Sequence, residues 1–201
     1  MYKAIIFDLG RVLVHFDFKH GYRALEGLCP YPAAEIPRHI APTGLVERFE
    51  TGLVEPHDFV EQLSSAIGLR TDYAGFCDIW NGIFQEPLIP ERILEGLAAR
   101  YRLVLLSNTN AIHFESIRAR YPLLRHFHEL VLSYQVRAMK PDPAIFQEAV
   151  RRAGCLPQEC FYTDDIAAYV EAARALGIDA VRFESAAQIE RELRARGIAW
   201  E

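Results

Sequence analysis

The stretch Lys3-Ala-Ile-Ile-Phe-Asp-Leu-Gly10 decides the fold that we expect for this chain. Residues 3–7 form a short run rich in branched and aromatic side chains, and the run stops at Asp8. An apolar run of this kind, without polar alternation, is typical of a strand buried on both faces of a parallel sheet. Asp8 therefore stands at the carboxyl end of a first strand, where open α/β sheets bind their ligands.

Similar apolar runs recur along the chain and predict further strands at 102–106, 129–132, 160–162 and 180–183. Helical segments of suitable length accompany them at 90–100, 111–120, 143–153, 166–176 and 186–196. The last two helices are each followed by Gly, the usual helix stop. Strands that alternate with helices form right-handed βαβ units. We therefore predict an α/β fold with a doubly wound, Rossmann-like parallel sheet.

One block breaks this alternation. From about residue 16 to residue 85 there is no convincing buried strand, only amphipathic helical pieces separated by Pro and Gly, at 19–28, 33–39, 43–49, 57–67 and 73–84. Such a block, inserted after the first strand, predicts a small α-helical cap domain. The expected organisation is a core domain of residues 1–15 and 86–201 and a cap domain of residues 16–85.

Composition narrows the class of protein. The formal net charge is −5 and no basic stripe is present, which argues against a nucleic-acid partner. No apolar run approaches the roughly 20 residues of a membrane-spanning helix, and the first residues lack the pattern of a secretory signal. The four cysteines form no CxxC pair and are expected to be reduced. We expect a cytoplasmic protein without a membrane partner, whose oligomeric state the sequence leaves open.

Polar residues follow the other predicted strands as well. Ser107-Asn108-Thr109 follow the strand at 102–106, Asp164-Asp165 follow the strand at 160–162, and Lys140 lies in a loop before a helix. Because the carboxyl ends of parallel strands meet at one edge of the sheet, these side chains and Asp8 are expected to form one site.

Each of these residue types suits phosphoryl transfer. The carboxylate of Asp8 can attack phosphorus and form an aspartyl-phosphate, which divides one difficult displacement into two easier ones. A hydroxyl and an amide can donate hydrogen bonds to phosphate oxygens, and the ammonium of Lys140 can neutralise charge. Paired aspartates can hold Mg²⁺, a cation that prefers oxygen ligands. The set points to catalysis by positioning and electrostatics.

Four motifs stand in the order in which the haloacid dehalogenase superfamily carries them: Phe7-Asp8-Leu-Gly-x-Val-Leu, Leu106-Ser-Asn-Thr109, Met139-Lys-Pro-Asp142 and Tyr162-Thr-Asp-Asp165. The chain resembles that superfamily over essentially its whole length. The long interval between the first two motifs marks its helical-cap members. FDLG in place of FDxD, with SNT and KPD, is most similar to the branch that contains bacterial α-D-glucose-1-phosphate phosphatases. The resemblance implies a Mg²⁺-dependent phosphatase acting on a small phosphorylated metabolite, with a sugar phosphate as the first expectation.

The resemblance also implies a role for each residue. Asp8 would be the nucleophile and a metal ligand, the backbone carbonyl of Gly10 a second ligand and Asp165 a third. Asp164 would support the metal directly or through water. The segment 11–17 would form a flap beside the nucleophile.

Ser107, Asn108 and Lys140 would hold the phosphoryl group by the same resemblance, with Lys140 also fixing the carboxylate of Asp8. Two positions depart from the family's pattern. Most phosphatases of the superfamily carry an Asp general acid and base where this chain has Gly10, and an Asn often stands where it has Tyr169. The source of the proton for the leaving group therefore stays open.

Two other functions remain as alternatives. A 2-haloacid dehalogenase would use Asp8 on carbon without a metal, but Asp164 and Asp165 beside the nucleophile would then be electrostatically costly. A catalytically silent member that binds a phosphorylated ligand or a protein partner is the second alternative. In the predicted cap, residues 48–50, 80–81 and Phe84 are candidates for the wall of the substrate cleft, although helical spacing favours the cap core for the aromatic ones.

Overall fold

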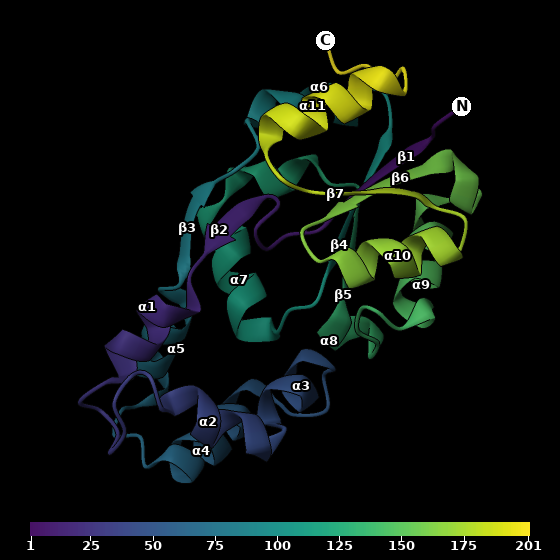
Figure 1. The fold of residues 1–201 in the computed structure, drawn as a ribbon. Coiled ribbons are helices and arrows are strands. Elements are labelled where there is room, and N and C mark those ends of the chain that lie inside the picture. The colour runs from purple at the N-terminus through teal and green to yellow at the C-terminus, as the bar shows by residue number, and fades with distance from the viewer.

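A five-stranded parallel sheet lies at the centre of the computed structural model, which describes residues 1–201. Its strands, in spatial order, are β5 (Glu129–Leu132), β4 (Arg102–Ser107), β1 (Ala4–Phe7), β6 (Cys160–Asp164) and β7 (Asp179–Arg182). Each neighbouring pair is parallel. β1 takes the middle position (Figure 1), so Asp8 emerges between the two halves of the sheet. The predicted doubly wound α/β fold is confirmed.

The sheet is buried on both faces, as the continuous apolar runs predict. Ile5 and Phe7 belong to a cluster of 27 buried residues, whereas Ala4 and Ile6 belong to a separate cluster of 15. The first cluster includes side chains of α6 (Glu91–Ala98), α7 (Ala111–Arg120) and α11 (Ala186–Ala195). The second includes side chains of α9 (Pro143–Ala153) and α10 (Ala167–Ala175). Successive residues of β1 thus face opposite layers of helices, which is the period-2 geometry of a strand.

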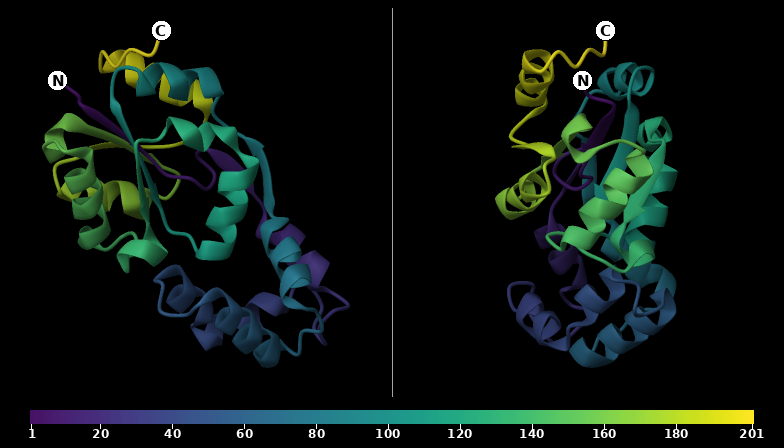
Figure 2. Two further views of the ribbon diagram at one scale, coloured as in Figure 1. Left: turned by 180° about the vertical axis from the view of Figure 1, so that it is seen from behind. Right: turned by 90° about the vertical axis from the view of Figure 1, so that its right-hand side faces the viewer.

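Five helices form a block at the end of the molecule opposite both termini (Figure 2). They are α1 (Phe18–Leu25), α2 (Ile36–Ile40), α3 (Leu45–Glu50), α4 (Pro56–Ile67) and α5 (Tyr73–Asn81). This helical block has its own cluster of 13 buried residues, in which Phe49 stacks on Phe59 with ring centroids 4.2 Å apart. No helix of the chain has the length and apolarity needed to cross a membrane.

Two short strands connect the helical block to the sheet, and the sequence analysis missed both. β2 (Val14–Phe16) pairs antiparallel with β3 (Phe84–Pro87), and Phe16 lies opposite Phe84. The expectation of no strand between residues 16 and 85 is therefore wrong at both ends, and the helix expected at 73–84 ends at Asn81. Strands this short carry little periodicity, and their pairing joins residues that are far apart in the sequence.

The remaining elements are short. α8 (Ser133–Val136) follows β5 directly, and three 3₁₀ turns lie at Ala41–Thr43, Pro122–His126 and Pro157–Glu159. α8 contacts both β5 and α3. It therefore forms a point at which the helical block meets the carboxyl end of the sheet.

Candidate active site

Lys140 lies at the centre of a buried charge cluster at the carboxyl end of the sheet. Its Nζ donates to Asp8 Oδ1 at 2.7 Å, to Asp164 Oδ2 at 2.6 Å and to the carbonyl oxygen of Leu106 at 3.2 Å. All three charged side chains are buried. A buried ammonium with three acceptors is fixed in position, because leaving any of these charges unpaired would be costly.

The sheet register brings the two aspartates together. Phe7 of β1 lies opposite Thr163 of β6, and the Asp8 N–H donates to the Thr163 carbonyl oxygen at 3.0 Å. Asp8 and Asp164, the next residue on each strand, therefore stand side by side. The expected convergence of Asp8, Lys140 and Asp164 at one sheet edge is what the structure has.

Burial and neighbouring charges shift the pKa values of Asp8, Lys140 and Asp165. Burial raises the pKa of Asp8 to about 7, with Lys140 opposing the shift and Asp164 adding to it. Burial by itself lowers the pKa of Lys140, but the carboxylates of Asp8 and Asp164 outweigh it and the pKa is raised. Lys140 therefore keeps its charge. Burial and the neighbouring Asp164 raise the pKa of the half-buried Asp165, against the effect of Arg11.

The site fits a divalent cation. Asp8, Asp164 and Asp165 each offer a carboxylate oxygen, and the three oxygens lie within 4.8 Å of one another. The ammonium of Lys140 pairs with Asp8 and Asp164, and the guanidinium of Arg11 acts on Asp165 without forming an ion pair, so carboxylates outnumber cations in the cluster. Mg²⁺ carries two positive charges and prefers oxygen ligands, so the donor set suits it. The ligand role of the Gly10 carbonyl stays a prediction.

Asn108 ties two loops of the site together. Its Oδ1 accepts from the backbone N–H of Lys140 at 2.8 Å, and its Nδ2 donates to the Lys140 carbonyl oxygen at 3.0 Å. The same Nδ2 lies 3.4 Å from the hydroxyl of Tyr169, whose ring centroid is 5.1 Å from Lys140 Nζ. The side chain of Asn108 thus holds the Lys140 loop in place. Tyr169 borders the site on its other side, and the predicted contact of Asn108 with phosphate is left to be tested.

Two residues that the sequence analysis did not single out support the site. The hydroxyl of Ser133 accepts from the Thr109 N–H and donates to the Thr109 carbonyl, both at 2.9 Å, which fixes the loop after β4. The hydroxyl of Tyr162 donates to Asp164 Oδ2. Both had a signal in the sequence: Ser133 follows a predicted strand directly, and Tyr162 lies two residues before Asp164, on the same face of β6.

The structure gives a reason for the glycine at position 10. A Cβ placed on Gly10 would lie 2.5 Å from Cε1 of Phe16, which is closer than atoms can approach. The ring of Phe16 therefore occupies the place of a side chain at position 10, and the guanidinium of Arg11 lies 4.9 Å from the centroid of that ring. An aromatic ring therefore stands where the resemblance of the motifs leads us to expect an acid–base carboxyl group.

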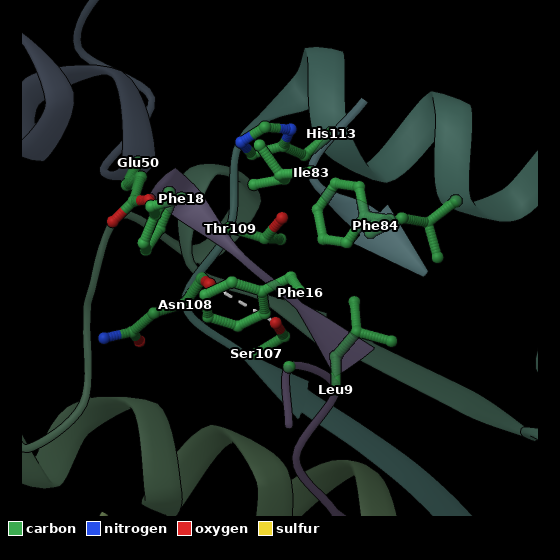
Figure 3. A pocket seen from close by; sticks show the side chains of 12 residues that line it. Leu9, Phe16, Phe18, Glu50, Ile83, Phe84, Ser107, Asn108, Thr109 and His113 are labelled. Atoms are coloured by element: carbon green, nitrogen blue, oxygen red, sulfur yellow. Dashed lines mark hydrogen bonds between the residues drawn. The ribbon is translucent and has the colours of Figure 1, made fainter. Parts of the chain in front are cut away.

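A pocket opens next to this ring, between the sheet edge and the helical block (Figure 3). It is lined by Leu9, Gly10, Phe16, Phe18, Glu50, Ile83, Phe84, Ser107, Asn108, Thr109, His113 and Ile117. Of the candidates for the cleft wall, Glu50 and Phe84 line it, whereas Phe49 is in the core of the helical block and Arg48 is exposed.

The other two cleft candidates lie behind the pocket and support His113. Asn81 Oδ1 lies 3.2 Å from Nδ1 of His113, and the ring of Trp80 stacks on the imidazole at 5.4 Å between centroids. Burial lowers the pKa of His113 to about 3, so the imidazole is neutral at neutral pH.

Comparison with known proteins agrees with this geometry. The family model described as haloacid dehalogenase-like hydrolase matches residues 2–177. The chain belongs to the haloacid dehalogenase-like hydrolase family, and the resemblance drawn from the four motifs is confirmed.

Individual relatives in this family are phosphatases. D-Ribitol-5-phosphate phosphatase of Bacteroides thetaiotaomicron is 29% identical over 96% of this chain and 97% of its own length. Fructose-1-phosphate phosphatase YqaB of Escherichia coli is 28% identical over 85% and 82%. A family enzyme of B. thetaiotaomicron, solved in complex with magnesium and inorganic phosphate, has a TM-score of 0.83 at 26% identity, covering 92% of this chain and 96% of that one.

Proposed function

We propose that this protein is a Mg²⁺-dependent phosphatase that hydrolyses a small phosphorylated metabolite, in the first place a sugar or polyol phosphate, through an aspartyl-phosphate on Asp8. The observation that carries the proposal is the Lys140 ammonium held between Asp8 and Asp164 in a cluster of three carboxylates. The phosphatase relatives and the magnesium complex of the solved family enzyme support the same chemistry.

The reaction has two displacements. In the first, a carboxylate oxygen of Asp8 forms a bond to phosphorus while the ester P–O bond breaks, and the leaving alkoxide takes up a proton. In the second, water attacks phosphorus and releases a proton to solvent, the bond to Asp8 breaks, and inorganic phosphate leaves while Asp8 returns to a carboxylate.

The chain's own residues position and stabilise these steps. Lys140 holds one oxygen of Asp8, which leaves the other oxygen to attack the phosphoryl group, and the charge of Lys140 would stabilise the negative phosphoryl oxygens. Ser107 and the backbone N–H of Asn108 are the proposed donors to those oxygens. Mg²⁺, held by Asp8, the Gly10 carbonyl and Asp165 with support from Asp164, would neutralise charge on the phosphoryl group.

The helical block and its connections supply the rest of the site. We assign residues 16–85 to a cap domain that closes over the leaving group, residues 1–15 and 86–201 to the catalytic core, and residues 11–17 to the flap between them. The separate hydrophobic cluster of the block supports this division. The four free cysteines support a reducing, cytoplasmic location.

Of the alternatives, attack on carbon is the weaker one. A dehalogenase that works without a metal would have to keep three carboxylates close together against one ammonium. A silent binding protein is opposed by the intact geometry of Asp8 and Lys140.

The test is a phosphatase screen over a panel of metabolites with and without Mg²⁺, with release of inorganic phosphate as the readout. We expect Mg²⁺-dependent turnover of several sugar or polyol phosphates. Absence of phosphate release from every ester, in a folded protein supplied with Mg²⁺, would refute the proposal.

A further inference from the structure

The pocket beside the phosphoryl site has an unusual charge pattern. Its walls include the apolar side chains of Phe16, Phe18, Ile83 and Phe84, and no lysine or arginine lines it. Two titratable side chains reach it, those of Glu50 and His113, and the buried imidazole is neutral at neutral pH. The carboxyl of Glu50 is therefore the one group in the pocket wall that can carry a charge there.

Glu50 has no partner within the protein. Its carboxyl makes no hydrogen bond and no ion pair, and it lies beside Phe18 on the helical-block side of the pocket, with Asn108 and Ser107 on the other side (Figure 3). Burial, with a smaller effect of Glu47, raises the pKa of Glu50 to about 7. A partly buried carboxyl without a donor costs free energy, and a ligand with hydroxyl groups would recover it.

The backbone holds Glu50 in this place. Gly52, two residues later, has φ of +67°, and a Cβ there would lie 2.1 Å from the carbonyl oxygen of Tyr134 in α8. The end of α3 can therefore lie directly on α8, beside the Ser133 hydroxyl that fixes Thr109. The position of Glu50 above the site follows from a close backbone contact between the helical block and the sheet domain.

We propose that Glu50 is the specificity-determining residue of this pocket, selecting uncharged polyhydroxylated leaving groups and rejecting leaving groups that carry a second anion. The assignment rests on the proposed phosphatase function. A phosphate ester held by Ser107 and Asn108 has its leaving group in the pocket, where hydroxyl groups can hydrogen-bond with the Glu50 carboxyl. A carboxylate or second phosphate would meet a like charge with no cation in the wall to offset it.

Other charged side chains near the site do not change this pattern. Arg11 acts on Asp165, at the metal side, and lies over the Phe16 ring outside the pocket lining. Lys140 is already paired with Asp8 and Asp164. Neither cation is placed to receive an anion on the leaving group.

The experiment compares two esters that differ in one group. Glycerol 3-phosphate ends in a hydroxymethyl group where 3-phosphoglycerate has a carboxylate. Their inhibition constants are measured against Mg²⁺-dependent hydrolysis of p-nitrophenyl phosphate at pH 8, so that slow turnover of either compound does not matter. We expect the wild-type protein to bind glycerol 3-phosphate about 10-fold more tightly or better, and Glu50→Gln to reduce that ratio by about 10-fold, because like charges in a partly buried pocket repel strongly.

The matched control is Glu47→Gln, which removes an exposed carboxylate one turn earlier on the same helix. It should change the ratio by less than about twofold, since exposed charges are screened by solvent. Each inhibition constant is measured against the variant's own hydrolysis of p-nitrophenyl phosphate, so that a change in the basal activity of Glu50→Gln does not enter the ratio.

Two outcomes separate the inference from the function on which it rests. An active Glu50→Gln protein with an unchanged ratio of inhibition constants overturns the role of Glu50 and leaves the phosphatase proposal standing. A folded wild-type protein without activity toward p-nitrophenyl phosphate overturns the proposed function, and the role of Glu50 with it.

Discussion

The two sides of the site differ in whether their charged side chains have partners within the protein. On the sheet side, Lys140 bridges Asp8 and Asp164 at 2.7 and 2.6 Å, and Tyr162 and the Ile166 N–H donate to Asp164 as well. On the side of the helical block, the walls are aromatic and the carboxyl of Glu50 has no protein donor. A region whose charges are paired and held is suited to chemistry, whereas a region with an unpaired group is suited to selecting a ligand.

The largest effect that we predict on the sheet side of the site is the loss of activity in Asp8→Asn. The amide is nearly isosteric with the carboxylate but is a poor nucleophile, so we expect kcat to fall on the order of 10³-fold or more. The measurement is phosphate release from the best substrate of the screen, with thermal unfolding to verify the fold. Substantial residual turnover in the carefully purified variant would contradict the nucleophile assignment.

Removal of the metal tests whether the cluster of three carboxylates holds Mg²⁺. Chelation should reduce turnover by more than about 10²-fold, because a bound cation contributes several kcal/mol to charge stabilisation in the transition state. Mg²⁺ should restore activity, whereas Ca²⁺ should substitute poorly, since it prefers more ligands at longer distances. Full activity after exhaustive chelation would show that the three carboxylates do not hold an essential metal ion.

The aromatic ring at the boundary of the two sides leads to a prediction about leaving groups. A positioned general acid is worth roughly 10²–10⁴-fold in rate, and the Phe16 ring stands where that acid would be. We therefore expect hexose 1-phosphates to be preferred about 10-fold over the matching 6-phosphates. The anomeric leaving group is less basic, so its departure depends less on protonation.

The measurement is kcat/KM for both isomers of one hexose phosphate, together with a series of aryl phosphates of varied leaving-group pKa. A clear preference for the 6-phosphate with a flat leaving-group dependence would show that another group supplies the proton.

The smallest expected effect is on folding stability and comes from His113, which lies where the two regions are in contact. The pKa of the buried imidazole is lowered to about 3, so between that value and the ordinary value the unfolded chain binds the proton and the folded protein does not. Stability is therefore lost as pH falls below about 6.5, by roughly 1 kcal/mol between pH 7 and pH 5.5. The check is urea unfolding of wild type and His113→Gln at both pH values. An equal loss in the variant would assign the effect to other groups.

The residues that we propose to react could be predicted from the sequence because their signals are local. Asp8, Ser107 and Asp164 each end or follow a buried strand that its own apolar run predicts, and parallel strands bring their carboxyl ends to one edge. The motif around Lys140 completed the set. Chain order and strand burial were sufficient to predict the sheet, the helical block and the aspartates at the sheet edge, whereas the place of Lys140 depended on its motif.

The tertiary structure alone decided what surrounds that cluster. The short pairing of β2 with β3 places Phe16 against Gly10, and the close approach of Gly52 to Tyr134 sets Glu50 above the pocket. These contacts join residues far apart in the chain and depend on packing distances of a few ångströms, which no local periodicity records. The sequence by itself therefore determined which residues meet at the proposed reaction site, and the packing of the helical block on the sheet determined the shape and charge of the pocket beside it.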